Sequence, residues 1–110
     1  MNKLSIIIPV YYNSETLEAL YDDLQKEVLP ELNDYEIVMV DDGSGDSSWE
    51  AMNSIAEKDS NVKLIKLSRN FGSHAAIYAG LSYCTGDCAT IKAADLQEPS
   101  GILIDMYKKW

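Results

Sequence analysis

The sequence has few of the residues that mark zinc-binding, disulfide-bonded or nucleic-acid-binding proteins. Its 110 residues include two cysteines and one histidine, which are too few for a four-ligand zinc site. We expect Cys84 and Cys88 to be reduced thiols. Nine basic residues against 18 acidic ones give a formal net charge of −9. Because this charge repels polyanions and no basic stripe opposes it, we exclude nucleic acid as a partner.

Long apolar runs are also missing. No run approaches the roughly 20 residues that a membrane-spanning helix needs. Residues 1–4 lead directly into a strand-like segment without the features of a signal peptide, so we expect a cytoplasmic location. The chain is 46% apolar and 25% charged, a composition that fits one small globular domain over residues 1–110.

Segments of strand length alternate with segments of helical spacing along the chain. The apolar runs predict strands over residues 4–10, 35–40, 62–67 and 88–92. The apolar residues at helical spacing predict helices over 17–28, 47–56 and 73–83, and a last one from Pro99 on. Ser47 and Glu50 match a capping box at the start of the second helix. This alternation, with its short connections, predicts an α/β fold with a parallel sheet.

The last predicted helix has no stop signal. Residues 106–110 contain no glycine, asparagine or proline. We therefore expect the chain to be the front part of a longer protein. Apolar surface beside the last strand would then be exposed, and large exposed apolar patches favour self-association. We accordingly expect a homo-oligomer.

Polar residues follow every predicted strand, at residues 9–13, 41–46, 68–72 and 93–99. Because ligands of open parallel sheets bind beyond the carboxyl ends of the strands, these four exits predict one shared crevice. Asp41 and Asp42 are adjacent carboxylates that repel each other and contribute little to packing. We therefore expect at least one of them to serve a ligand. The fingerprint G-x-G-x-x-G is absent, and Gly43 and Gly45 fit a tight turn as well as a ligand loop.

Other polar and aromatic residues at these exits have more than one interpretation. Asp95 and Gln97 are oxygen donors suited to a hard cation such as Mg²⁺ or Mn²⁺. Arg69 fits a phosphate contact and a surface ion pair equally well. For His74, helix capping or packing is favoured over catalysis. Tyr11 and Tyr12 fit edge aromatics, with stacking on a base as the alternative.

Five segments of the chain occur in an order that resembles a known family. They are 8–11 (IPVY), 40–44 (VDDGS, followed by Asp46), 68–72 (SRNFG), 86–87 (GD) and 94–99 (ADLQEP). The series resembles the family 2 glycosyltransferases with the GT-A fold. It is most similar to the branch that transfers sugars to polyprenyl phosphates, the dolichyl- and undecaprenyl-phosphate glycosyltransferases. The resemblance implies a Rossmann-like three-layer α/β/α fold, of which this chain is the N-terminal, donor-binding part.

The resemblance also implies roles for the matching residues. The pocket for the base of a UDP- or GDP-linked sugar involves Pro9, Val10, Tyr11 and Asp41, with Asp42 alongside. It further implies a donor contact for Arg69, and it places the ribose and a divalent metal, Mg²⁺ or Mn²⁺, at Asp95 with help from Gln97. A metal there neutralises charge that develops on the leaving diphosphate.

What lies on the acceptor side is implied by the resemblance alone. The acceptor would be a lipid phosphate or a glycan, used in the synthesis of cell-envelope polysaccharide. The full-length protein would be associated with the cytoplasmic face of a membrane. No catalytic residue is identified within residues 1–110, because the family's acceptor-side base lies further along the chain.

The sequence departs from the family pattern at the metal motif. Ala93 stands where the family has the first aspartate of Asp-x-Asp, which leaves Asp95 and Gln97 to reach the metal. A catalytically silent nucleotide-binding domain is therefore an open alternative. A receiver-type phosphoacceptor module is a weaker one. Receivers carry their acid pair after the first strand, whereas Asp41 and Asp42 follow the second.

Overall fold

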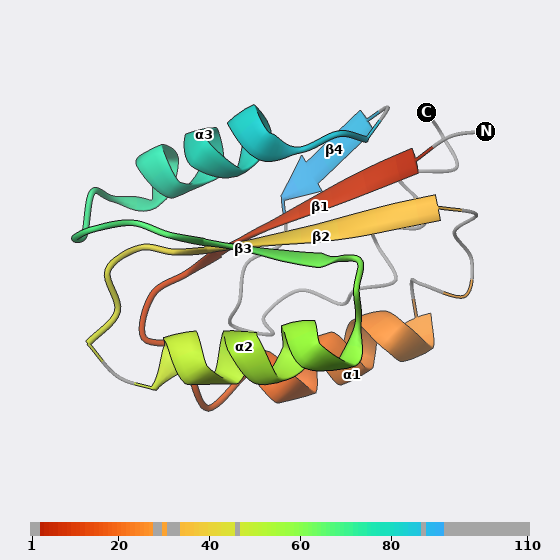
Figure 1. The fold of residues 1–110 in the computed structure, drawn as a ribbon, viewed down its shortest axis with the longest axis horizontal. Helices are drawn as coiled ribbons and strands as arrows, with labels where there is room; N and C mark the ends of the chain where they lie inside the picture. Colours follow the sequence, from red (N-terminus) through yellow and green to blue (C-terminus); the bar gives the residue numbers. More distant parts are fainter. Residues whose placement is uncertain (1–2, 28–29, 31–33, 46, 87, 92–110) are drawn as a thin grey trace.

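The computed structural model describes residues 3–27, 30, 34–45, 47–86 and 88–91 (Figure 1). Strands and helices alternate, as the sequence predicts. The strands are β1 (Lys3–Val10), β2 (Asp34–Asp41), β3 (Val62–Lys66) and β4 (Cys88–Ile91), and the helices are α1 (Leu17–Glu27), α2 (Ser48–Lys58) and α3 (Ser73–Tyr83). The helix predicted from Pro99 on lies outside the described residues.

The four strands form one parallel sheet in the order β3-β2-β1-β4. Helices α1 and α2 cover one face of this sheet and α3 covers the other (Figure 1), so the predicted three-layer arrangement is confirmed. From β1 the chain moves outward through β2 to β3, and it then crosses to the opposite side of β1 to form β4. The strand order therefore reverses beside β1, and open α/β sheets bind ligands at the carboxyl ends next to such a point.

The two faces of the sheet have apolar cores of different size. The larger core lies under α1 and α2 and includes Ile6, Ile8, Ile37 and Met39 together with residues of both helices. The smaller one lies under α3, and its buried members are Ile7, Val38, Val40 and Ala76. Because each buried aliphatic side chain contributes about 1.5–3 kcal/mol, α3 has much less apolar stabilisation than the opposite layer.

A buried carboxylate lies at the amino end of the sheet, on the α3 face. Glu36 of β2 is 1% exposed. It accepts hydrogen bonds from Ser5 Oγ at 2.5 Å and from the backbone N–H of Thr85, and Lys63 Nζ lies 2.6 Å from its other oxygen. Burial alone would raise the pKa of Glu36, but Lys63, Ser5 and Thr85 lower it from 4.5 to about 2. Glu36 thus joins β1, β2 and β3 to the segment that enters β4.

A second polar network connects α1 and β2 to the turn before β3. The hydroxyls of Tyr21 and Tyr35 donate to Asp59 Oδ2 at 2.8 and 2.7 Å, and the backbone N–H of Asn61 donates to Oδ1 at 2.9 Å. Burial and the nearby Asp59 carboxylate raise the pKa of both tyrosines. Burial disfavours the charged form of Asp59, yet these hydrogen bonds hold its pKa below the ordinary value.

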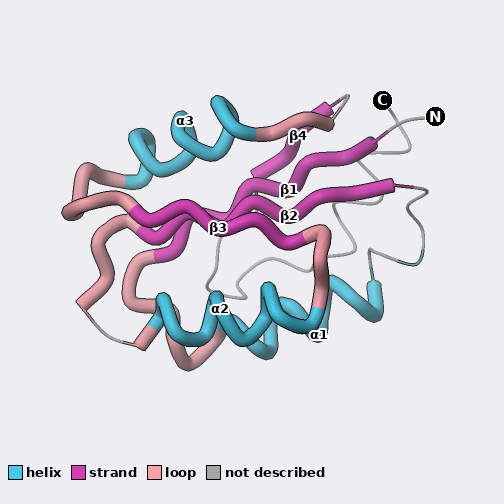
Figure 2. The backbone as a smooth tube through the Cα atoms, in the orientation of Figure 1, coloured by secondary structure: helices cyan, strands magenta, loops and turns pink. Residues whose placement is uncertain are grey.

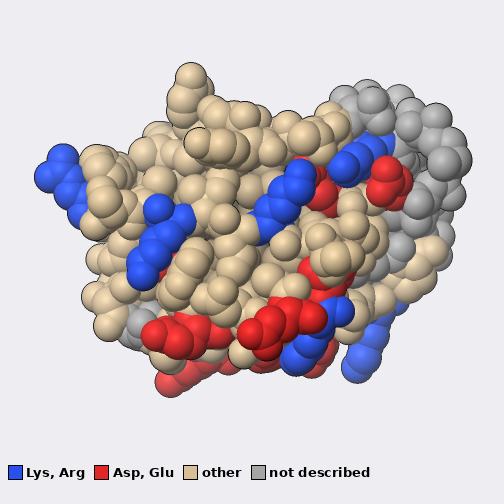
Figure 3. Space-filling model, viewed as in Figure 1, with Lys and Arg blue, Asp and Glu red and all other residues tan. Residues whose placement is uncertain are grey.

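Acidic and exposed apolar side chains lie over different helices. Acidic side chains gather over α1 and α2, along the lower part of the molecule in Figure 3. The outer face of α3 instead exposes Tyr78, Leu81 and Tyr83, and Ile91 at the end of β4 is 47% exposed. Within residues 3–91, no helix that the structure describes has the length and apolarity to cross a membrane. The expectation of a homo-oligomer stays a prediction.

Replacing Glu36 by glutamine tests the network at the amino end. At about pH 7, Glu36→Gln should lower the free energy of unfolding by about 2–4 kcal/mol, because Lys63 loses its partner and a buried acceptor is lost. Since the folded-state pKa lies below the unfolded value of 4.5, this stabilisation is complete above pH 4.5 and is lost as the pH falls towards about 2. The difference between parent and variant should therefore shrink over that window.

Urea unfolding at a series of pH values measures this difference. The exposed Glu57 provides the matched control, Glu57→Gln. A difference between parent and Glu36→Gln that stays constant from about pH 5 to pH 2 would contradict the assigned role.

Candidate functional site

The connections that leave β1, β2 and β3 meet at the carboxyl edge of the sheet (Figure 2). The N–H of Asp42 donates to Val10 O at 2.8 Å, and the N–H of Leu67 donates to Asp41 O at 2.9 Å. The N–H of Tyr12 donates to Ser44 Oγ at 3.0 Å. Three of the four predicted exits therefore share one edge. The fourth, residues 93–99, lies outside the described residues.

Asp41 and Asp42 are held apart by the alternation of the strand. Successive side chains of a strand point to opposite faces, so Asp41 shares the face of Ile37 and Met39, and Asp42 shares that of Val38 and Val40. This separation relieves much of the repulsion expected between adjacent carboxylates. It also gives the two residues different partners.

Asp41 is fully buried and only partly satisfied. Its exposed fraction is 0%. Oδ1 accepts from the backbone N–H of Ser44 at 3.1 Å, whereas Oδ2 has no hydrogen-bond partner among the described residues. A buried acceptor left unpaired costs about 1–3 kcal/mol. The site thus offers a charged acceptor, at the edge where ligands bind, for an N–H or O–H donor.

Both carboxylate oxygens of Asp42 accept hydrogen bonds from the connection between β3 and α3. Oδ1 accepts from the N–H of Phe71 at 2.8 Å, and Oδ2 accepts from the N–H of Gly72 at 3.1 Å and from Asn70 Nδ2 at 3.0 Å. The residue is 3% exposed. In the described structure, the carboxylate therefore serves the loop of residues 69–72, here named loop 69–72.

Gly43 lets loop 69–72 come this close. Its φ is +73°, and a Cβ on this residue would collide with the backbone of Arg69 and Asn70. The position therefore requires glycine both for the left-handed conformation and for space. The positive φ fits the tight-turn interpretation of Gly43.

The end of β1 and the residues after it shape the site in two ways. Val10 is fully buried in the core under α1 and α2, and its carbonyl oxygen accepts the hydrogen bond from the N–H of Asp42. Pro9 is partly buried, and Tyr11 and Tyr12 are 47% and 52% exposed. Their rings meet edge to face at 4.6 Å. Tyr12 has a φ of +55°, which is rare for a bulky residue and is held by the bond to Ser44.

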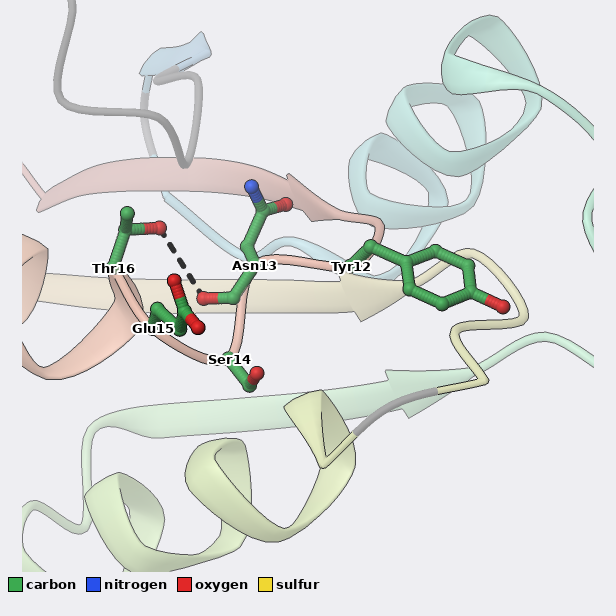
Figure 4. A pocket seen from close by; sticks show the side chains of 5 residues that line it. All are labelled: Tyr12, Asn13, Ser14, Glu15 and Thr16. Atoms are coloured by element: carbon green, nitrogen blue, oxygen red, sulfur yellow. Dashed lines mark hydrogen bonds between the residues drawn. The ribbon is translucent and has the colours of Figure 1, made fainter.

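A hollow of about 370 Å³ lies at the start of α1, a size within the range of small-molecule sites. Figure 4 shows its lining residues, Tyr12, Asn13, Ser14, Glu15 and Thr16. Residues 14–16 were not predicted to belong to a site, although a helix start directly after a strand exit was a usable signal.

The predicted capping box at Ser47 is wrong, because Ser47 makes no side-chain capping bond. Instead, Ser48 Oγ accepts from the N–H of Asn13 at 2.9 Å, which links the start of α2 to the segment after β1.

Arg69 lies exposed on loop 69–72, with its guanidinium carbon 4.7 Å from the centre of the Phe71 ring. Among the described carboxylates, none forms an ion pair with Arg69, which weakens the surface ion-pair interpretation. His74 is exposed in the first turn of α3.

The predicted metal ligands cannot be placed in this geometry. Asp95 and Gln97 lie outside the described residues, as do Asp46, Asp87 and Ala93. Within the described part of the chain, no group of three or more His, Cys, Asp or Glu side chains is arranged to hold a metal ion. Asp41 is enclosed and Asp42 is occupied. The metal site expected at Asp95 and Gln97 therefore stays a prediction.

Known proteins resemble this chain over nearly its whole length. The profile described as "Glycosyl transferase family 2" matches residues 5–110. The uncharacterized glycosyltransferase YkcC of Bacillus subtilis (strain 168) is 39% identical over 107 residues, 96% of this chain and 33% of that protein. An undecaprenyl-phosphate 4-deoxy-4-formamido-L-arabinose transferase of Yersinia pestis (strain Pestoides F) is 43% identical over 100 residues, 90% of this chain and 31% of that protein. The chain spans about a third of the length of these relatives.

Solved structures share the fold. A mannosyltransferase from Pyrobaculum calidifontis, in complex with GDP-Man and Mn²⁺, superposes with a TM-score of 0.84 at 24% identity, over 99% of this chain and 32% of that one. S. aureus TarS 1-349 in complex with UDP-GlcNAc gives a TM-score of 0.77 at 27% identity, over 96% of this chain and 30% of that one. The fold class and the resemblance noted in the sequence are thus confirmed.

A pair of glycine substitutions tests the contact between Gly43 and loop 69–72. Both Gly43 and Gly72 have positive φ, but a Cβ on Gly72 would meet nothing within 4 Å. Gly72→Ala should therefore cost about 1–3 kcal/mol from backbone strain alone. Gly43→Ala should cost more, because the loop must also move. Chemical denaturation of both variants measures the difference, and equal losses would show that the close approach contributes nothing to stability.

Proposed function

Because this chain belongs to glycosyl transferase family 2, we propose that it is the donor-binding part of a glycosyltransferase. It binds a sugar linked to a nucleoside diphosphate, for transfer to an acceptor held by the rest of the protein. The single observation that carries this proposal is Asp41, a fully buried carboxylate with one oxygen unpaired among the described residues, at the carboxyl edge beside the switch point.

The base is the part of the donor that Asp41 suits. Uracil and guanine each carry ring N–H groups, and a buried carboxylate that accepts an N–H makes a charge-assisted hydrogen bond. Val10 is paired in register with Asp41 and borders this position, and we assign Pro9 and Tyr11 to the same pocket. GDP-Man and UDP-GlcNAc in complexes of proteins with this fold support a donor of either kind.

The phosphates belong to a different part of the site. Arg69 is an exposed cation without a carboxylate partner among the described residues, and we assign it to the donor diphosphate. Asp95 and Gln97 would hold Mg²⁺ or Mn²⁺, and such an ion neutralises negative charge on the diphosphate. The Mn²⁺ in the Pyrobaculum calidifontis complex supports this assignment.

One relative supports a proposal for the acceptor. An undecaprenyl-phosphate sugar transferase is 43% identical to this chain over 100 residues. We therefore propose a polyprenyl phosphate as the acceptor and a role in cell-envelope synthesis at the cytoplasmic face of a membrane. A glycan acceptor remains the alternative for the full-length protein.

Ala93 favours a second candidate function, a nucleotide-binding domain without transferase activity. The loss of one carboxylate weakens a site for a hard cation. Metal-dependent donor binding without transfer by the full-length protein would support this candidate. The receiver-type alternative has no support, because Asp41 and Asp42 lie at the end of the second strand, whereas receivers carry their acid pair after the first.

A substitution at Asp41 tests the base pocket. Asp41→Asn should weaken binding of UDP or GDP about 10- to 100-fold, since a hydrogen bond to a charged group contributes roughly 1.5–3 kcal/mol. The same change should keep or raise the free energy of unfolding, because it removes a buried and incompletely paired charge. Titration calorimetry and urea unfolding measure the two effects. Asp34→Asn, at the exposed start of the same strand, is the control. Equal nucleotide affinities of parent and Asp41→Asn would remove Asp41 from the pocket.

Restoring the missing carboxylate tests the metal assignment. Ala93→Asp should increase affinity for the preferred nucleoside diphosphate only when Mn²⁺ or Mg²⁺ is present, because charged oxygen ligands strengthen binding of a hard cation. The measurement is a calorimetric titration of parent and variant with metal and with a chelator. If the gain is the same in both conditions, residue 93 acts on the nucleotide and not through a metal.

A further inference from the structure

We propose that Asp42 is a positioning residue, which holds loop 69–72 at the mouth of the crevice so that Arg69 faces the donor phosphates. The inference rests on the proposed function for the role of Arg69, whereas the hold on the loop is a property of the chain itself. Asp42 then affects donor binding without touching the donor.

The hydrogen bonds of Asp42 define this hold. Its carboxylate accepts from two consecutive backbone N–H groups, those of Phe71 and Gly72, and from the side chain of Asn70. Asn70 Nδ2 also lies 3.2 Å from the carbonyl oxygen of Asp42. Every residue from 70 to 72 is therefore bonded to Asp42. Consecutive N–H groups that converge on one anion form a concave site that fits a carboxylate.

The charge of Asp42 fits its surroundings. Gly72 is the N-cap of α3, so the carboxylate lies at the positive end of the helix dipole, where a negative charge is stabilised. None of the ion pairs among the described residues includes Asp42. The negative charge of Asp42 is therefore stabilised by backbone N–H groups. A neutral side chain of the same shape would accept weaker hydrogen bonds from these groups.

The hold extends from Asp42 to Arg69 through Phe71. The backbone of Phe71 is bonded to Asp42, and the ring of Phe71 supports the guanidinium of Arg69 at 4.7 Å. On the other side, the missing side chain of Gly43 leaves room for the backbone of Arg69. The direction of Arg69 is thus set by contacts that begin at Asp42.

The hydrogen bonds of Asp42 argue against direct contact with the donor. Both of its carboxylate oxygens already accept from loop 69–72. A direct contact with the nucleotide would require the loop to release the carboxylate first. Asp41 differs in this respect, because one of its oxygens has no partner among the described residues.

Hydrogen exchange in the absence of nucleotide tests the hold on the loop. In Asp42→Asn, one carboxylate oxygen becomes an NH₂ group that faces N–H donors. The amides of Phe71 and Gly72 should then exchange at least about tenfold faster than in the parent, since local opening costs less free energy. Asp34→Asn provides the matched control, because Asp34 is exposed at the amino end of the same strand. Unchanged exchange at residues 70–72 in Asp42→Asn would overturn the proposal.

A double-mutant cycle with Arg69→Ala tests the route to the donor. If Asp42 acts through Arg69, Asp42→Asn should weaken UDP or GDP binding about tenfold in the parent and less than about twofold in the Arg69→Ala background. Equal losses in both backgrounds would overturn the proposal, because they mean that Asp42 acts without Arg69. Asn70→Ala removes one donor and leaves the carboxylate in place, so it should give a smaller loss of the same kind if Asp42→Asn does not fold.

The two measurements separate this inference from the proposed function. If the parent binds neither UDP nor GDP with Mn²⁺ present, the proposed function fails, and the exchange rates alone decide whether Asp42 holds the loop. If the parent binds nucleotide and the exchange rates do not change, the inference fails while the proposed function stands.

Discussion

The bond between the carboxylate of Asp42 and loop 69–72 is the constraint on which the arrangement of the site depends. The backbone N–H of Asp42 reaches Val10 at the end of β1, and its side chain reaches the start of α3. One residue therefore joins the exits of three strands, which are far apart along the chain. These bonds fix the position of loop 69–72, which carries Arg69, relative to the end of β1. The exposure of 3% keeps water from competing for these bonds.

Two buried carboxylates, one in β2 and one directly after it, hold α3 at both of its ends. Asp42 binds the segment before the helix, and Glu36 binds Thr85 directly after it. The apolar core beneath α3 has only four buried members among the described residues, Ile7, Val38, Val40 and Ala76. Small residues such as Gly80 bring this helix close to the sheet, because a Cβ there would lie 2.5 Å from Ile7 Cγ2, but they bury little area. The polar bonds at the two ends therefore add to this small core in fixing the position of α3, and β4 and the residues predicted to bind a metal follow α3 in the chain.

Much of the fold was predictable because its pattern is local. Apolar runs such as 4–10 and 35–40 became β1 and β2 nearly to the residue, and the spacing of Leu17, Leu20, Tyr21 and Leu24 became α1. The site was predictable only in part. Asp41 and Asp42 look alike in the sequence, yet one leaves an oxygen unpaired among the described residues and the other holds a loop. Glu36 gave no signal at all, since a glutamate in a strand usually faces water and its partners Ser5, Lys63 and Thr85 are distant in sequence.

The sequence by itself determined the alternation of strands and helices, the polar strand exits and the family, because periodicity and ordered motifs are properties of neighbouring residues. Only the tertiary structure decided which strand exits meet, to which face of the sheet Asp41 and Asp42 each point, and which donors bond to each carboxylate. The reason is physical. The pairing of a buried polar group depends on residues such as Phe71 and Gly72 that come near Asp42 only after the sheet has formed. The sequence does not reveal which backbone N–H groups will bind a carboxylate, since every residue except proline has a backbone N–H.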